Sequence, residues 1–228
     1  MGNIDLVNLV SLLIIFMVVL LLAFSAHECG HAWMSYKFND DTAYMLGRVT
    51  LNPVKHTDPI GTLLIPAIAF IFGAIGGGLG SIPLIGWGKP TPVNPRKWTN
   101  YATANVMVSI AGVLANLILL IMGVIAAKVM MLQGFQTGDF FGRSENPLVI
   151  FVGDMMFLNL SLFVFNLLPF PPLDGSKILS TFLPTSFQPV LDLFEQYGFL
   201  ILMFLIYMGV FRAIITPFYY ALAYILSL

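Results

Sequence analysis

The strongest constraint on the fold is a set of long apolar blocks. They cover about residues 6–36, 60–87, 102–129, 148–168 and 197–228. A helix needs about 20 apolar residues to cross the hydrocarbon layer of a bilayer, and each block is long enough to do so. Because lipid offers no hydrogen-bond partners, a spanning segment must satisfy its own backbone groups, as a helix does. The sequence therefore predicts a multi-pass membrane protein made mainly of helices.

The composition excludes most other classes of protein. Hydrophobic residues make up 58% of the 228 residues and charged residues 9%, against about 45–50% and about 25% in soluble domains. No polar stretch is long enough to form a separate soluble core, so we expect residues 1–228 to form a single domain. The net charge of -1 provides no basic surface for nucleic acid. The single cysteine, Cys29, cannot form an internal disulfide.

The second block and the residues after it are irregular. Glycines at 76–78 and 80 favour a turn inside the block, followed by an extended return through residues 82–87. Prolines at 90, 92 and 95 then require extended backbone. Residues 46–53 have the β-branched content and terminal proline of a short strand or extended segment. We therefore expect an all-α polytopic membrane protein with five to six hydrophobic segments and a short extended or re-entrant β-like element.

A polar motif interrupts the first block near its end, where the sequence reads His27-Glu28-Cys29-Gly30-His31. Residues four apart on a helix are separated by about 40° around its axis, so both imidazoles can reach one metal ion while Glu28 stays beside it. In zinc peptidases the glutamate of such a motif takes a proton from the metal-activated water. Histidines that only bonded each other would not require the glutamate. We predict that His27 and His31 bind metal and that Glu28 is catalytic.

A third metal ligand is needed, because a hydrolytic zinc ion usually has three protein ligands and one open position. Asp174 is the best candidate, since prolines at 169, 171 and 172 unwind the chain just before it. Irregular backbone at membrane depth is tolerated where it lines a cavity in the protein. Alternatively, Asp174 caps a short helix over residues 175–182. The spacing alone supports both interpretations equally.

The H-E-x-x-H motif and a distant N-x-x-P-x-P-x-L-D-G stretch at residues 166–175 together resemble the site-2 protease family, peptidase family M50. Residues 47–53 and 86–95 are similar to the compact prokaryotic branch of that family, which lacks a PDZ domain. One departure is Val113, where many relatives have proline. The resemblance implies an intramembrane zinc metalloendopeptidase that hydrolyses peptide bonds within or next to transmembrane segments.

The same resemblance implies roles for individual residues. Zn2+ would be bound by His27, His31 and Asp174, and Glu28 would be the general base. Asn166 would help to hold the substrate. The partners implied are a transmembrane protein substrate and the surrounding lipid bilayer, while the oligomeric state is left undetermined.

The topology can be predicted from the same two motifs. Both lie at the C-terminal ends of their blocks, so the first and fourth blocks must run parallel for Asp174 to reach the histidines. Block 60–87 must then cross twice or not at all. One membrane face would carry most of the basic residues, which are Lys37, Arg48, Lys55, Lys89, Arg96, Lys97 and Lys177, with Lys128 and Arg143 opposite. The positive-inside rule makes the first face cytoplasmic, so we expect a prokaryotic inner-membrane protein with its active site toward the cytoplasm.

Other polar residues allow two interpretations each. Asn105, Ser109, Gly112 and Asn116 share one helical face, which favours close helix packing, although Asn116 is also a second-tier candidate for binding substrate. His56 follows a turn, where a hydrogen bond or titration is the default and an auxiliary metal or substrate role is the alternative. The segment 82–94 is either a connector or an edge that pairs with an extended substrate.

Two rival functions use the same motif. A metal-ion transporter would need several ligand pairs along a pathway, whereas the chain has three histidines. A non-catalytic scaffold or chaperone would keep zinc for stability alone. Replacing Glu28 with Gln separates these alternatives from a protease, because it should spare the metal and abolish hydrolysis.

Overall fold

The structure is a computed structural model that describes residues 6–75, 88–142 and 144–228. Its described part contains helices and no strand, so the prediction of an all-α polytopic membrane protein is confirmed. Five helices are long and apolar enough to cross a membrane: α1 (Leu6–Lys37), α4 (Tyr101–Met131), α5 (Pro147–Leu167), α7 (Gln188–Tyr207) and α8 (Val210–Ser227).

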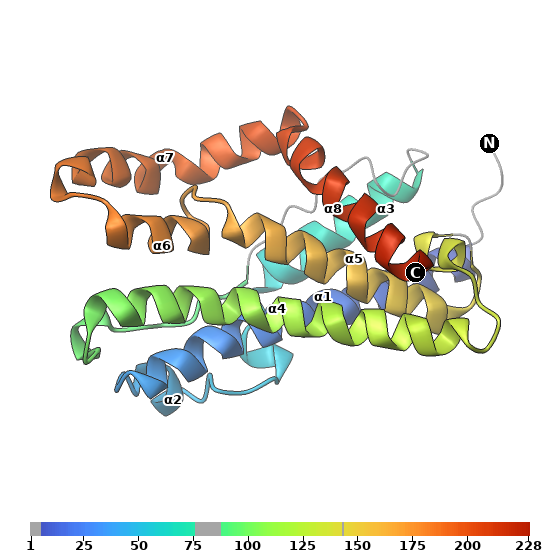
Figure 1. Cartoon of the computed structure of the whole chain (residues 1–228), viewed down its shortest axis with the longest axis horizontal. Helices are drawn as coiled ribbons and strands as arrows, with labels where there is room; N and C mark the ends of the chain where they lie inside the picture. Colours follow the sequence, from blue (N-terminus) through green and yellow to red (C-terminus); the bar gives the residue numbers. More distant parts are fainter. Residues whose placement is uncertain (1–5, 76–87, 143) are drawn as a thin grey trace.

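Helices α1, α4 and α5 form the central bundle, and α4 lies alongside the other two (Figure 1). Gly30 of α1 lies against the α4 backbone, where an added Cβ would be 2.6 Å from the carbonyl oxygen of Ala111. Gly153 of α5 is packed in the same way against the carbonyl oxygen of Phe140. Small residues allow helix backbones to approach closely in a membrane, where packing replaces the hydrophobic effect.

Apolar side chains of these helices divide between an interior and a lipid-facing surface. Met156, Val149 and Leu226 belong to a buried cluster that joins α4, α5 and α8. Ile118 of α4 and Ile14 of α1, by contrast, are each 58% exposed. A surface this apolar is suited to lipid chains, in agreement with the composition.

The shorter elements lie at one end of the bundle and along its side (Figure 1). After α1 come α2 (Thr42–Met45), a short 3-10 helix (Pro53–Lys55), a π-helix (Pro59–Leu64) and α3 (Ile65–Ile75). Between α5 and α7 lies α6 (Asp174–Phe182). Residues 46–53, expected to form a short strand or an extended segment, form no strand: Gly47 has φ 64° and lies in a turn, and extended backbone is found at Asn52. The last apolar block begins at Gln188, nine residues earlier than expected, and is divided in two at Gly209 (φ 79°).

Contacts between distant residues establish the direction of the helices. His31 contacts Val108 while His27 contacts Asn116, so α1 and α4 are antiparallel. Asn116 contacts Asn159, and Asn105 contacts Lys177 beyond the end of α5, so α5 is antiparallel to α4 and parallel to α1. The parallel arrangement predicted for the two motif-bearing helices is therefore present.

The described residues on either side of the second block lie close together. The backbone N–H of Lys89 donates to the carbonyl oxygen of His56 over 2.9 Å. The predicted return through residues 82–87 lies outside the described residues. So does Arg143, one of the basic residues used to predict the orientation in the membrane. The residues that flank the block, His56 and Lys89, therefore lie side by side, as two crossings or none would require.

Candidate metal centre

The two motif histidines lie one turn apart on α1 and face each other. Both are buried, with 8% of each residue exposed, and their Nε2 atoms are 3.0 Å apart. Asp174 Oδ2 lies 3.2 Å from Nε2 of His27 and 3.1 Å from Nε2 of His31. Two helices far apart in the sequence thus bring together, in one triangle, three atoms that could bind a metal ion.

The second nitrogen of each ring determines which tautomer is present. His31 Nδ1 lies 2.7 Å from the carbonyl oxygen of Val108, which can only accept, so Nδ1 carries the proton. His27 Nδ1 lies 2.8 Å from Oδ1 of Asn116. The Asn116 amide nitrogen donates to the carbonyl oxygen of Ala23, which fixes its oxygen toward His27. In the neutral rings, both Nε2 lone pairs therefore point into the triangle.

The triangle fits a bound cation. Asp174 Oδ2 is buried and accepts no hydrogen bond, although a buried carboxylate oxygen normally has a partner. Three lone-pair atoms at separations of 3.0, 3.1 and 3.2 Å repel one another unless a positive charge lies between them. Zinc bonds of about 2.0–2.1 Å in tetrahedral geometry separate ligand atoms by roughly 3.3 Å. The donor types and their spacing thus match a zinc ion, with one position left open.

The Asp174 carboxylate is held by the start of α6 and by the loop before it. Its Oδ1 atom accepts a hydrogen bond of 2.9 Å from Nζ of Lys177, one helical turn later. Gly175 lies against the carbonyl oxygens of Leu167 and Leu168, where a side chain would not fit. Leu173, rather than Asp174, occupies the cap position of α6. The geometry therefore disfavours the interpretation of Asp174 as a helix cap, since its carboxylate is directed toward the histidines.

Helix α4 supports the site from behind. A Cβ added to Gly112 would lie 2.5 Å from His31 Nε2 and 2.9 Å from His27 Cε1. Asn105, one of the same polar face, donates to the carbonyl oxygen of Lys177 over 2.9 Å and to Thr181 Oγ1 over 2.8 Å. The small and polar face of α4 therefore packs against both α1 and α6, as the sequence pattern suggested.

Glu28 occupies the next position of α1, beside the triangle. Its Oε2 atom accepts a hydrogen bond of 2.7 Å from the backbone N–H of Thr91. Gly88 lies close to the other oxygen, since an added Cβ would be 4.0 Å from Oε1. The extended segment after the second block thus contacts the carboxylate that the motif assigns to proton transfer.

The remaining candidates lie around this centre. Asn116 is fully buried behind His27, and Asn166 is half-buried near the end of α5, where it donates to the carbonyl oxygen of Leu162. His56 is fully buried and its Nε2 lies 2.8 Å from the carbonyl oxygen of Thr50. Cys29 and Asp154 are not part of the metal-binding group found in the described chain.

Sequence reasoning missed three contacts at this site. Thr91 contacts the Glu28 carboxylate through its backbone N–H, so the identity of its side chain does not reveal this contact. Val108 likewise contributes a carbonyl oxygen. Asn159, which accepts a 3.0 Å hydrogen bond from Asn116, could have been found as a polar amide within the mainly apolar sequence of α5.

Comparison with known proteins agrees with these motifs. The profile described as "Peptidase family M50" matches residues 15–209. The chain belongs to peptidase family M50. This M50 chain is 37% identical over 195 residues to "Putative zinc metalloprotease YwhC" of Bacillus subtilis (strain 168), covering 86% of the chain and 81% of that protein. No solved structure matches it.

A second bacterial relative is more distant. The M50 chain is 30% identical over 188 residues to "Putative zinc metalloprotease Rip2" of Mycolicibacterium smegmatis, which covers 82% of the chain and 64% of that protein. The corresponding Rip2 of Mycobacterium tuberculosis (strain H37Rv) is 29% identical over 187 residues. Membership of this zinc-dependent family, together with the five apolar helices, makes the chain a multi-pass membrane zinc metalloprotease.

Proposed function

We propose that this M50 metalloprotease hydrolyses peptide bonds within or next to transmembrane segments of other membrane proteins. The single observation that carries the proposal is the convergence of His27, His31 and Asp174 inside a bundle of membrane-spanning helices. These three residues would hold the zinc ion. No other metal-binding group of this kind occurs among the described residues.

The level of the site along the bundle supports an intramembrane substrate. Asn116, which contacts His27, lies between Leu114 and Ile118 on α4, and these two apolar residues are 43% and 58% exposed. Trp33, two residues after His31, is 48% exposed. Apolar surface at the same level as the metal ligands suits lipid or an apolar substrate helix.

The chemistry requires a nucleophile, a base and an open position. A zinc ion, when bound, would supply the Lewis acidity that makes water nucleophilic near neutral pH. Glu28 would accept the proton of that water and return it to the leaving nitrogen of the cleaved peptide. The Lys177 contact occupies Asp174 Oδ1, which directs Oδ2 toward the metal. Asn166, from the end of α5, would help to hold the substrate, and Asn116 would position His27 besides its tentative role in binding.

The orientation in the membrane follows from charge. Lys97 pairs with Asp41, and the carbonyl oxygen of Lys177 contacts Asn105 near the start of α4, at the same end as Lys37. Lys128 lies at the other end of α4. By the positive-inside rule, the first end would face the cytoplasm, and the active site would open toward that side of a prokaryotic cell membrane.

The proposal is tested by comparing the wild type with Glu28→Gln in the same host. Zinc content of the purified proteins, measured by mass spectrometry, should be equal, because Glu28 is outside the ligand triangle. Cleaved transmembrane peptides should appear in the membrane proteome of cells with the wild type and not with the variant. Equal peptide patterns in the two strains would refute the proposal, as would cleavage confined to soluble proteins.

A further inference from the structure

Thr91 contacts Glu28 at two points. Its backbone N–H donates to Oε2 of the Glu28 carboxylate over 2.7 Å, and its hydroxyl donates to the Glu28 backbone carbonyl oxygen over 3.0 Å. The two residues are 63 positions apart in the sequence. One residue thus fixes both the helix turn that carries Glu28 and the end of its side chain.

The segment that carries Thr91 is stiff. Pro90 and Pro92 flank Thr91 and restrict the backbone to extended conformations. Before them, the N–H of Lys89 donates to the carbonyl oxygen of His56. A stiff segment loses little conformational freedom when it holds a partner, so it suits a positioning role.

The far end of the segment is anchored through a buried carboxylate. Asp40, which is fully buried, accepts hydrogen bonds at Oδ2 from the N–H of Asn94 (2.7 Å) and from the hydroxyl of Ser35 (2.8 Å). The indole N–H of Trp98 donates to the same hydroxyl over 2.8 Å. Ser35 lies two turns beyond Glu28 on α1, so the segment is tied to α1 after Thr91 and to His56 before it.

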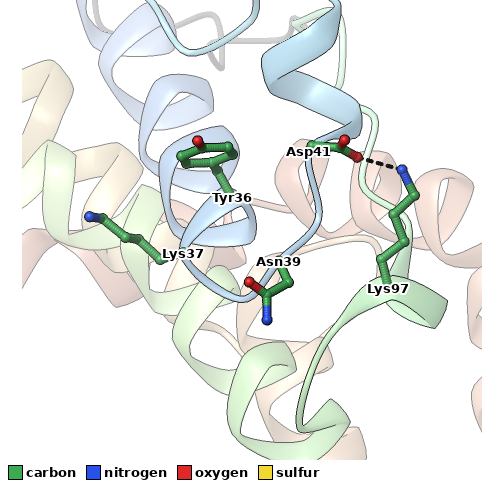
Figure 2. A pocket seen from close by; sticks show the side chains of 5 residues that line it. All are labelled: Tyr36, Lys37, Asn39, Asp41 and Lys97. Carbon is green, nitrogen blue, oxygen red and sulfur yellow. Dashed lines mark hydrogen bonds and ion pairs between the residues drawn. The ribbon is translucent and has the colours of Figure 1, made fainter.

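The last of these anchoring contacts lies at a pocket at the end of α1 (Figure 2). Lys97 reaches across from the chain after the segment to Asp41, and their charged atoms are 2.5 Å apart. Nearby, the Asn39 amide donates to Thr99 Oγ1 over 2.7 Å. This frame keeps the residues after Asn94 in register with α1.

The hydrogen bonds of the segment favour support over pairing with a substrate strand. The N–H groups of Lys89, Thr91 and Asn94 all donate inward, and the prolines between them have none. Val93 has the one N–H from residue 89 to 95 that makes no hydrogen bond in the described chain. Strand pairing needs alternating donors and acceptors, and this stretch offers almost no donors.

We propose that Thr91 is a positioning residue for the general base, an inference that rests on the proposed function of Glu28. The N–H of Thr91 occupies Oε2 and thereby leaves Oε1 as the oxygen that would accept the proton of the water. The carboxylate is then oriented before the substrate arrives, so no reorganisation is needed during the reaction. The hydroxyl contact holds the Glu28 backbone while the N–H holds its side chain.

The test uses three variants of the full-length protein in liposomes. The probe is the transmembrane peptide most strongly cleaved in the proteomic comparison, synthesised with a fluorophore and a quencher. Thr91→Pro removes the N–H, Thr91→Val removes only the hydroxyl, and Thr91→Ser keeps both. Val93→Pro is the matched control for added stiffness, and Thr103→Val, at an exposed site of α4, is the control for loss of a hydroxyl.

Thr91→Pro should lower kcat by about 10- to 100-fold, the range typical for loss of a supporting hydrogen bond, with KM and zinc content unchanged. The kcat of Thr91→Val should lie between those of Thr91→Pro and the wild type. Thr91→Ser should have a kcat close to that of the wild type, and the kcat of both control variants should equal it.

A wild-type kcat for Thr91→Pro would overturn the inference, and so would a change in KM alone. An increase in kcat would also overturn it, because the contact would then be a restraint that must break. Glu28→Gln in the same assay distinguishes failure of the proposed function from failure of the positioning role. If Glu28→Gln cleaves the probe, the proposed function itself fails; if it is inactive while Thr91→Pro is fully active, only the positioning role fails.

Discussion

The side-chain oxygen of Asn116 lies 2.8 Å from Nδ1 of His27, while the nitrogen of the same amide donates to Ala23 and Asn159. One buried side chain of α4 therefore joins α1 and α5 and orients His27, one of the three candidate metal ligands. Because the amide cannot reverse without losing both donor contacts, it keeps the lone pair of His27 Nε2 directed at the metal position.

Replacing Asn116 with Leu should weaken zinc binding. The substitution removes the acceptor for His27 Nδ1, so the ring can rotate or change tautomer, and zinc affinity should fall by about 10- to 100-fold. Competition with a chelator of known affinity measures this change. Asn8→Leu, at an exposed site near the start of α1, is the matched control and should bind zinc as the wild type does. Unchanged affinity in Asn116→Leu would contradict the role assigned to the amide.

Replacing Asn159 with Leu tests the next step of the same chain of hydrogen bonds. Asn116 would lose one of its two acceptors, and Asn159 is fully buried, so the free energy of unfolding should fall by about 1–3 kcal/mol. Zinc affinity should fall less than in Asn116→Leu. In the double variant, the loss in free energy of unfolding should be smaller than the sum of the two single losses, because both substitutions interrupt one hydrogen-bond network. Full additivity in the double variant would argue that the amides act independently.

Gly112→Ala should prevent zinc from binding. The new methyl group would lie 2.5 Å from Nε2 of His31, so the imidazole must move out of the triangle. Gly123→Ala, on the same helix, places its methyl against the Met156 side chain and provides the control for stability. Zinc content measured by mass spectrometry should be lost in the first variant and retained in the second. Full zinc occupancy in Gly112→Ala would show that the helices can separate without cost.

Asp40 should make stability depend on acid pH. Burial alone would raise the pKa of Asp40, but hydrogen bonds from Thr42, Asn94 and Ser35 outweigh burial and hold the pKa below its ordinary value. The contribution of ionised Asp40 to the stability of the fold is therefore complete above the ordinary pKa of about 3.9, and it is lost as the pH falls below that value.

The corresponding experiment follows thermal unfolding in detergent from about pH 6 to about pH 3. Asp40→Asn should unfold at a lower temperature than the wild type at the upper pH, and the difference should shrink toward the lower pH. Asp192→Asn, which changes an exposed carboxylate of α7, should follow the wild type throughout. A constant difference between Asp40→Asn and the wild type would mean that the charge of Asp40 is not what stabilises the anchor.

Much of the central bundle could be predicted from the sequence. The bounds expected for α1, α4 and α5 agree with the structure to within two residues, because each block is mainly apolar and is bounded by polar or proline residues. The start of α7 was missed because Asp192 and Glu195 make its first turns look like a polar loop. Of the two alternatives expected at 46–53, a short strand or an extended segment, the strand does not form, because β-branched residues favour a strand only when a partner strand is available.

The candidate site was predictable where side chains carry the chemistry. His27, Glu28 and His31 follow from helical spacing, and the structure brings Asp174 to the same two imidazoles. The groups that orient them were not predictable in the same way. Val108 contacts His31 through its backbone carbonyl, and Thr91 contacts the Glu28 carboxylate through its backbone N–H, so only the fold reveals these two contacts.

The close contact of α1 with α4 limits how any molecule can approach the metal ligands. Gly30 lies against the Ala111 carbonyl, and Gly112 lies against both imidazole rings, so no atom fits between the helices at that level. A peptide, or an inhibitor with a zinc-chelating head, must therefore carry its bulk on the side away from α4. Compounds built with a short linker and a body that projects from that open side would suit this enzyme better than flat chelators flanked on both sides.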